Sequence, residues 1–230
     1  MKKNILLIGG SHGIGLDLVK ELQNDFNVIV ASRNADDLEG MAITHIPFDA
    51  ISEELKMSQL PEKLHGFAYL PGSINLKPFK MLSTDVFKKD MELNFFAMVN
   101  VVKSIMPKMD EGSSMVFFST VAVRTGMPFH TSVAAAKGAV EGFSKSLAAE
   151  YAPKIRVNTI APSLVDTPLA ERLLNNDKKR EMMSSRHPMK RVGESKDIAN
   201  LAAFLLSDKS SWLTGQVMGV DGGLSTLNVN

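Results

Sequence analysis

The segment 4–15, N-I-L-L-I-G-G-S-H-G-I-G, decides the fold of this chain. Its first five residues form a short apolar run rich in β-formers, and glycines follow at once. From residue 14 to residue 23 apolar side chains recur at helical spacing. A strand that runs through a glycine-rich turn into a helix is the opening unit of an α/β protein.

The rest of the chain repeats this alternation of short apolar runs and amphipathic segments. We expect strands at 4–8, 27–31, 44–48, 66–70, 115–119, 155–160 and 216–220. We expect helices at 14–23, 84–108, 132–151, 168–185 and 195–207. The strands are continuously apolar, as in parallel sheets covered on both faces. The sequence therefore predicts an α/β fold with a doubly wound parallel sheet (Rossmann-type) of about seven strands, in one domain over 1–230.

Composition excludes several classes of protein. The 230 residues are 44% hydrophobic and 22% charged, which is typical of a globular chain and not of a disordered one. The chain has no Cys, which excludes disulfides and thiolate chemistry, and we expect no metal site. A net charge of +1 favours neither nucleic acid nor an anionic membrane as a partner. No run approaches the ~20 apolar residues that span a bilayer, so we expect a cytoplasmic protein.

The glycine-rich turn is the first candidate site. Glycines at 9, 13 and 15 permit a tight turn, close approach of phosphate oxygens to the backbone, and close packing of helix on strand. The alternative is a loop that serves the turn alone, but its place between the first strand and the first helix favours phosphate binding. The candidate residues are Gly9, Ser11, His12, Gly13, Ile14 and Gly15.

The spacing Gly-x-x-x-Gly-Ile-Gly resembles that of the short-chain dehydrogenase/reductase family. Further matches follow in the family's order over about 215 residues: Asp49, Asn94, Ser119-Thr120, Lys137, the segment 155–168 and the segment 215–223. The resemblance implies a nicotinamide cofactor and an oxidoreductase that acts on carbonyl or hydroxyl groups.

The residues after the second strand predict which nicotinamide cofactor is bound. An acidic residue there favours NAD, whereas Ser32 and Arg33 suit a 2′-phosphate. His12 adds a donor to the same phosphate, and we predict NADP(H). The alternative is that Arg33 is an ordinary exposed loop residue.

The resemblance implies further cofactor contacts. They are Asp49 and Ala50 at the adenine, Leu70, Pro71 and Gly72 where the family has Asn-Ala-Gly, and Pro162, Val165 and Thr167 beside the nicotinamide. Ser163 stands where the family usually has Gly.

The catalytic pattern of the family is incomplete here. The family pairs a Ser that holds the substrate carbonyl with a Tyr that exchanges the proton, a Lys that holds the ribose, and an Asn that binds a relay water. Lys137 and Asn94 match, and Thr120 replaces the Ser while keeping a hydroxyl. Val133 stands at the tyrosine position, four residues before Lys137. Without the Tyr, Lys137 has the alternative role of binding ribose alone, and Thr120 that of closing its strand.

His130 is the candidate replacement for the missing acid. It precedes Lys137 by seven residues, two helical turns, and imidazole exchanges protons near neutral pH. The alternative is a loop histidine with no catalytic role.

Two functions fit these residues. The first is an NADP(H)-dependent oxidoreductase of a small-molecule substrate with an atypical proton donor, either His130 or water. The second is a catalytically impaired NADP(H)-binding protein that acts as a sensor or a partner. We expect a mobile lid at 168–190, and the resemblance of the helices 84–108 and 132–151 implies a homodimer or homotetramer.

Overall fold

The computed structural model describes residues 2–228. Seven parallel strands form one sheet in the order β3-β2-β1-β4-β5-β6-β9. They are β1 (Asn4–Ile8), β2 (Asn27–Ser32), β3 (Ile43–Pro47), β4 (Leu64–Tyr69), β5 (Met109–Phe118), β6 (Ile155–Pro162) and β9 (Val217–Val220). The strand order reverses between β1 and β4, which is where ligands bind in open α/β sheets. The predicted doubly wound sheet is confirmed.

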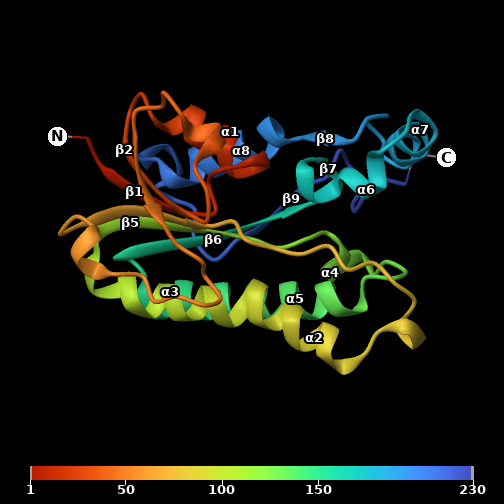
Figure 1. Ribbon diagram of the computed structural model, residues 1–230, viewed down its shortest axis with the longest axis horizontal. Helices are drawn as coiled ribbons and strands as arrows, with labels where there is room; N and C mark the ends of the chain where they lie inside the picture. Colours follow the sequence, from red (N-terminus) through yellow and green to blue (C-terminus); the bar gives the residue numbers. More distant parts are fainter. Residues whose placement is uncertain (1, 229–230) are drawn as a thin grey trace.

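Helices cover both faces of the sheet. On one face lie α1 (Gly13–Leu22) and α8 (Ser195–Leu206), and on the other lie α3 (Ala97–Ile105) and α5 (Thr131–Tyr151) (Figure 1). Such cover buries both faces of every central strand, which explains why the strand sequences are continuously apolar.

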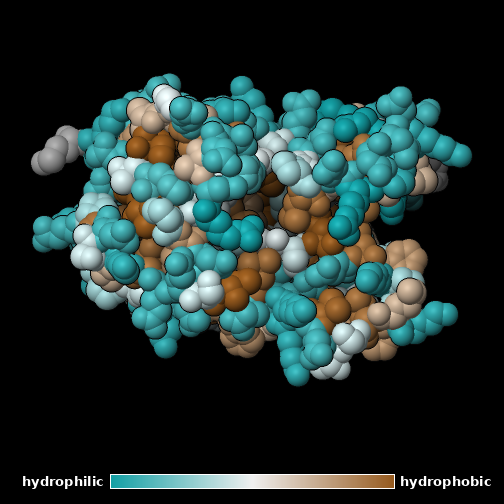
Figure 2. Space-filling view, in the orientation of Figure 1, coloured by the Kyte–Doolittle hydropathy of each residue, from teal (hydrophilic) through white to brown (hydrophobic). Residues whose placement is uncertain are grey.

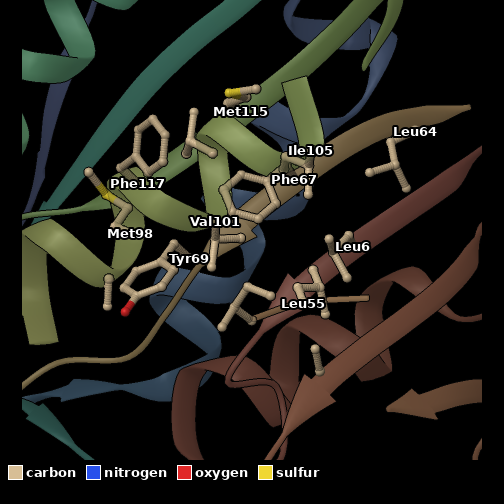
Figure 3. Close-up of a cluster of buried hydrophobic side chains, with 14 of the residues drawn as sticks. Leu6, Leu55, Leu64, Phe67, Tyr69, Met98, Val101, Ile105, Met115 and Phe117 are labelled. Carbon is tan, nitrogen blue, oxygen red and sulfur yellow. The ribbon is translucent and has the colours of Figure 1, made fainter. Parts of the chain in front are cut away.

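Two apolar cores result, one on each face. Figure 3 shows the larger one, in which side chains of β1, β4 and β5 meet those of α3. Phe67 and Phe117 are fully buried there and pack edge to face, with ring centroids 6.2 Å apart. Packing of this kind stabilises the sheet.

Three segments differ from the helices and strands expected from periodicity. The expected helix 84–108 consists of α2 (Thr84–Met91), a π-helical turn at Glu92–Phe96 and α3. The expected helix 168–185 is broken into α6 (Glu171–Leu174) and α7 (Asp177–Ser185), with Asn176 capping α7 through a bond from the Lys179 amide. The fifth strand begins six residues earlier than expected, at Met109.

Three short elements were not expected from the sequence: α4 (Ala122–Thr125), and the two-stranded sheet of β7 (Val165–Asp166) and β8 (Gly193–Glu194). Each has four residues or fewer, which is too short to show periodicity.

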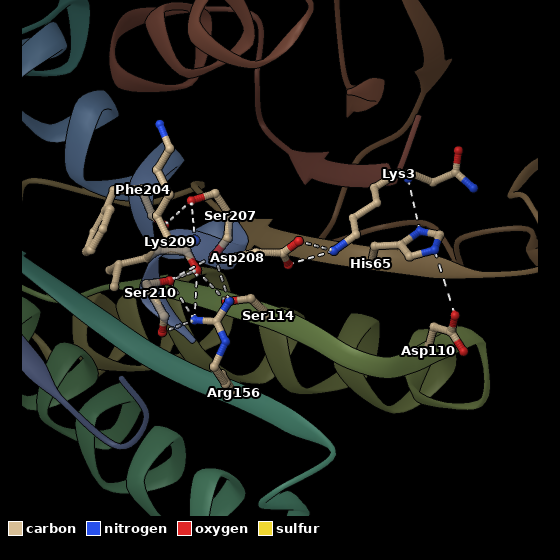
Figure 4. Close-up of polar contacts among 12 residues, drawn as sticks. Lys3, His65, Asp110, Ser114, Arg156, Phe204, Ser207, Asp208, Lys209 and Ser210 are labelled. Atoms are coloured by element: carbon tan, nitrogen blue, oxygen red, sulfur yellow. Dashed lines mark hydrogen bonds and ion pairs between the residues drawn. The ribbon is translucent and has the colours of Figure 1, made fainter. Parts of the chain in front are cut away.

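The end of the sheet opposite the cleft is held by polar contacts. The Arg156 guanidinium on β6 donates to the carbonyl oxygens of Leu205, Ser207 and Ser210, at 3.0–3.1 Å (Figure 4). These carbonyls lie at and just beyond the C-terminus of α8, where helix oxygens lack partners and a cation is favourable. Within residues 2–228 no helix has both the length and the apolar composition needed to cross a membrane.

Candidate active site

A cleft of about 530 Å³ opens at the carboxyl ends of the strands. Its walls come from the turn after β1, the ends of β4, β5 and β6, the start of α5, and the segment 162–187. Figure 2 shows apolar side chains, in brown, around a hollow between the part of the molecule with α6 and α7 and the part with α2 and α4. The volume is within the range of small-molecule sites.

Most of the predicted site residues line this one cleft. They are Gly9, His12, Gly13, Ile14, Gly15, Arg33, Leu70, Gly72, Thr120, His130, Lys137, Pro162, Val165 and Thr167. Val133 lines it too. Six predicted residues do not line the cleft: Ser11, Ser32, Asp49, Ala50, Pro71 and Asn94.

Side chains are disfavoured at two positions of the glycine turn. A Cβ on Gly15 would lie 2.5 Å from the Gly9 carbonyl oxygen, so only glycine lets α1 pack this closely on the turn. At Gly9, whose φ is +81°, a Cβ would lie 3.1 Å from the Pro71 ring. Bare backbone therefore faces the cleft beside the N-terminus of α1, where unpaired amides and the positive end of the helix dipole favour an anion. This cradle fits the pyrophosphate of a dinucleotide.

The side of the cleft that follows β2 carries basic side chains. Arg33 is exposed at the rim. His12 Nδ1 lies 2.6 Å from Asp37 Oδ2, so the imidazole is paired with a carboxylate. Ser32 is turned inward, where its hydroxyl donates to the Asn34 carbonyl at 2.7 Å. Of the three residues expected at a 2′-phosphate, Arg33 and His12 line the cleft and Ser32 does not.

The adenine-side candidates lie outside the cleft. Asp49 Oδ1 accepts a bond from the Ile51 amide at 2.9 Å, and Ala50 packs against the apolar core. The Ser11 hydroxyl donates to Asn34 Oδ1 at 3.0 Å. These contacts hold the loops that border the cleft.

Lys137 extends from α5 into the cleft and is 9% exposed. Burial lowers the pKa of Lys137 to about 8, although the charge of Asp90 acts in the opposite direction. Its Nζ lies 3.4 Å from the point where a side chain on Gly72 would begin, and Asn94 Oδ1 lies 3.3 Å from the same point. Gly72 is therefore small enough to let both polar groups approach.

Asn94 is held in the π-helical turn behind Lys137. Its amide nitrogen donates to Ser73 Oγ and to the Asp90 carbonyl oxygen, at 2.9 and 2.8 Å. Its buried Oδ1 finds no hydrogen-bond partner among the residues that the structure describes. A π-turn rearranges the backbone bonds of a helix and is frequent at functional sites.

Hydroxyl and imidazole groups complete this end of the cleft. Thr120 follows β5, and its Oγ1 accepts a bond from the Ala122 amide at 3.3 Å. His130 immediately precedes α5, with Nδ1 2.7 Å from the Pro128 carbonyl oxygen. That bond favours a proton on Nδ1.

No phenol reaches the cleft from residues 2–228. Val133 is 5% exposed at the cleft wall. The Tyr69 hydroxyl donates to the Leu93 carbonyl oxygen in the core, and burial raises the pKa of Tyr69. Tyr151 packs against the core at the far end of α5.

Sequence reasoning missed two polar groups near the cleft. His187 is 4% exposed, lines the cleft, and lies 2.9 Å through Nε2 from Ser163 Oγ. Asp90 is 1% exposed and lies behind Lys137 and Asn94. The spacing of Asp90 and Asn94, four residues within a helical segment, is a signal that places them on one face. No comparable signal joins Ser163 to His187.

The sequence is similar to those of known proteins over most of its length. Residues 48–225 match a family model described as enoyl-(acyl carrier protein) reductase. A tropinone reductase homologue of Arabidopsis thaliana is 31% identical over 97% of this chain and 92% of its own length.

Solved structures are similar as well. A short-chain dehydrogenase family protein of Francisella tularensis superposes with a TM-score of 0.89 at 27% identity, covering 99% of this chain and all of its own. ElxO with NADP bound gives a TM-score of 0.87 at 27% identity, with 99% and 100% coverage.

Proposed function

This chain belongs to the short-chain dehydrogenase/reductase family, and from that premise we propose that it is an NADP(H)-dependent oxidoreductase. It transfers hydride between the nicotinamide and a carbonyl or hydroxyl substrate. One observation carries the proposal: a single cleft joins the glycine cradle, Arg33, and the polar end with Thr120 and Lys137.

The cofactor is held along the length of the cleft. The backbone of 9–15 binds the pyrophosphate, and Arg33 binds the 2′-phosphate because a planar guanidinium matches phosphate oxygens. Pro162, Val165 and Thr167 border the nicotinamide. The structural similarity to ElxO, which was solved with NADP bound, supports this assignment. When bound, the cofactor supplies the hydride.

Lys137 and Thr120 stabilise negative charge on the substrate oxygen. Arrival of hydride at a carbonyl carbon leaves charge on the oxygen, and preorganised donors lower the energy of that state. The Thr120 hydroxyl donates to the oxygen. Because the pKa of Lys137 is about 8, its side chain is mostly an ammonium at pH 7 and adds positive charge.

The proton comes from an atypical donor. Val133 occupies the position where the family has Tyr, so the wall that usually bears a phenol is apolar. His130 lines the same cleft, and its Nδ1 contact with the Pro128 carbonyl leaves Nε2 to exchange a proton. We assign the proton to His130, or to water that enters the cleft.

The segment 168–190 is the substrate lid in this proposal. Leu169, Leu173 and Met183 line the cleft from that segment, and Leu169 is 55% exposed. Apolar side chains on short broken helices suit a cover that closes over an apolar part of the substrate. Self-association into a homodimer or homotetramer is part of the same proposal.

A second function is favoured by one observation. Val133 is well packed at the wall, which suits a protein that binds NADP(H) with little redox activity and acts as a sensor or a partner. Measurable turnover of a carbonyl or hydroxyl substrate distinguishes the oxidoreductase from the binding protein.

Installing a phenol tests the proposal. We expect Val133→Tyr to raise NADPH-dependent reduction of a carbonyl panel by roughly 10²-fold or more, since positioned proton transfer contributes that much. Val133→Phe adds the same ring without the hydroxyl and gives no increase. A rate for Val133→Tyr equal to that of Val133→Phe argues for a site that does not perform reduction.

The wild-type donor is tested separately. His130→Ala lowers turnover and shifts its pH profile if His130 gives the proton. Unchanged turnover assigns that step to water, and no hydride transfer by the wild type to any carbonyl tested supports the binding function.

A further inference from the structure

Asp90 is a buried carboxylate that the proposed reaction does not use. It lies near the end of α2 with 1% of its surface exposed. Ser73 Oγ and Asn75 Nδ2 each donate to its Oδ1 at 2.6 Å, and Ser132 Oγ donates to its Oδ2 at 2.5 Å. An ionised carboxylate only accepts hydrogen bonds, and three donors match that requirement. Burying a charged carboxylate costs free energy even when it is hydrogen-bonded, which suggests that Asp90 has a role beyond packing.

The donors tie Asp90 to the polar end of the cleft. Ser73 follows Gly72, where Lys137 Nζ and Asn94 Oδ1 both approach. Ser73 Oγ also accepts from the Asn94 amide, which in turn donates to the Asp90 carbonyl oxygen. Ser132 precedes Val133 on α5. Asp90 therefore connects the loop after β4, the π-helical turn and the first turn of α5.

Other titratable groups lie in the cleft or beside Lys137 on α5, and Arg186 and His187 line the same cleft from the C-terminal end of α7. Glu141, one turn later on α5, accepts from Ser119 Oγ at 2.7 Å and lies 3.7 Å from the Arg124 guanidinium of α4. His130 is placed at the start of α5 and contacts a backbone carbonyl. Asp90, from α2, is the carboxylate whose charge favours the ammonium form of Lys137.

We propose that Asp90 is a positioning residue for Lys137, acting as the fixed counter-charge that keeps the lysine cationic beside Gly72 and Asn94. Asp90 and Lys137 form no direct ion pair, so the effect acts through space across the network of Ser73 and Asn94. The role of this counter-charge in catalysis rests on the proposed function, in which the Lys137 ammonium stabilises the substrate oxygen. Because Val133 provides no hydroxyl at the cleft wall, that charge matters more. The charge coupling itself needs no cofactor.

Competitive acetylation measures this coupling on the full chain without cofactor. Acetic anhydride reacts with neutral amines only, and mass spectrometry of the Lys137 peptide from pH 6.5 to 10 gives the titration of that one side chain. In the wild type we expect a midpoint near the pKa of about 8. In Asp90→Asn the midpoint falls by about one pH unit. Asp85→Asn, the same change at an exposed position of α2, leaves it in place.

If Asp90→Asn does not fold, a second pair of variants tests the same coupling. Ser132→Gly makes room for a longer side chain, and it is combined with either Asp90→Glu or Asp90→Gln. The two double variants have the same shape and differ in charge. A higher Lys137 midpoint in the Glu variant supports the proposal. Equal midpoints in this pair, or in wild type and Asp90→Asn, overturn it.

NADPH titrations distinguish this proposal from the proposed function. If Asp90→Asn binds NADPH more weakly than the wild type at pH 8 and equally at pH 6, the lowered lysine charge is the cause. A wild type that binds no NADPH refutes the proposed function and leaves the acetylation result standing. A loss that is equal at both pH values assigns Asp90 a structural role only, and overturns the proposal.

Discussion

The two ends of the cleft are built in different ways. At the glycine turn the shape is set by backbone, because a Cβ on Gly15 would meet the Gly9 carbonyl oxygen at 2.5 Å. At the other end it is set by side chains: Lys137 lies against Gly72 and Asn94, with Asp90 behind them. The first end depends on a few consecutive residues, and the second on loops and helices far apart in the chain.

This difference indicates how each end tolerates change. A site made of backbone has one geometry and fails when a side chain is added. A site made of hydrogen-bonded side chains keeps its shape through partners, and its charge responds to pH. The predictions below test this contrast, from the largest expected effect to the smallest.

Adding one methyl group to the glycine turn has the largest effect. Gly15→Ala places a Cβ against the backbone of Gly9 and Gly10, at 2.5 and 2.8 Å, and backbone does not yield cheaply. We expect the free energy of unfolding in urea to fall by about 3 kcal/mol, and NADPH binding to be lost. Gly142→Ala is the control, since nothing lies within 4 Å of its Cβ and helix propensity favours alanine by up to ~1 kcal/mol. Equal stabilities of the two variants would contradict the close packing.

Replacing the buried amine of Lys137 should stabilise the protein at neutral pH. The pKa of Lys137 is about 8 in the folded chain against an ordinary lysine pKa of 10.5, so between these values the unfolded state binds more protons. The wild type therefore gains stability as the pH rises through this window, and carries the full cost of the buried charge below pH 8. Lys137→Met lacks this cost.

We expect the difference in free energy of unfolding between Lys137→Met and the wild type to shrink as the pH rises. Lys137→Met is more stable than the wild type at pH 7, and its advantage falls by roughly 2 kcal/mol by pH 9.5. Urea unfolding at the two pH values measures it. A constant difference shows that Lys137 does not titrate in this window. Lys137→Arg keeps a charge throughout and serves as the control.

Arg33 tests the cofactor end without altering its backbone. We expect Arg33→Ala to weaken NADPH binding about tenfold, or roughly 1.4 kcal/mol, and NADH binding much less. Arg33→Lys restores part of the loss because it keeps the charge but not the planar fork. Fluorescence titration of both cofactors measures this, and equal losses for NADPH and NADH refute the phosphate assignment.

Asp37 gives the smallest expected effect, in the opposite direction. Its carboxylate lies 2.6 Å from His12, beside the proposed 2′-phosphate site. Asp37→Asn removes a negative charge and frees the imidazole, so NADPH binding tightens by about two- to fivefold, within the range of an exposed charge interaction. If Asp37→Asn binds NADPH with unchanged affinity at low salt, the 2′-phosphate binds elsewhere.

Much of the fold could be predicted from the sequence, because continuous apolar strands and a glycine turn leave few topologies. The π-helical turn at Glu92–Phe96 could not, since its residues keep an ordinary helical spacing. The break between α6 and α7 was missed because Asn175 and Asn176 interrupt the helix through local capping rather than through Gly or Pro.

The candidate site shows the same contrast between features set by local sequence and features set by contacts between distant segments. The glycines were predictable because their conformations are local. Ser32 faces inward because His45 on β3 provides a partner for its hydroxyl at 3.0 Å, a contact between strands that the motif does not show. Asp90 acquires its partners only when the loop after β4 and α5 come together, so sequence spacing relates it to Asn94 alone.

Calorimetric titration of NADPH into the wild type and Gly15→Ala tests the central claim most directly. The account predicts saturable binding of one NADPH per chain by the wild type, weaker binding of NADH, and no binding by a folded Gly15→Ala. Absence of heat from the wild type at millimolar NADPH, with the protein folded, would contradict the account.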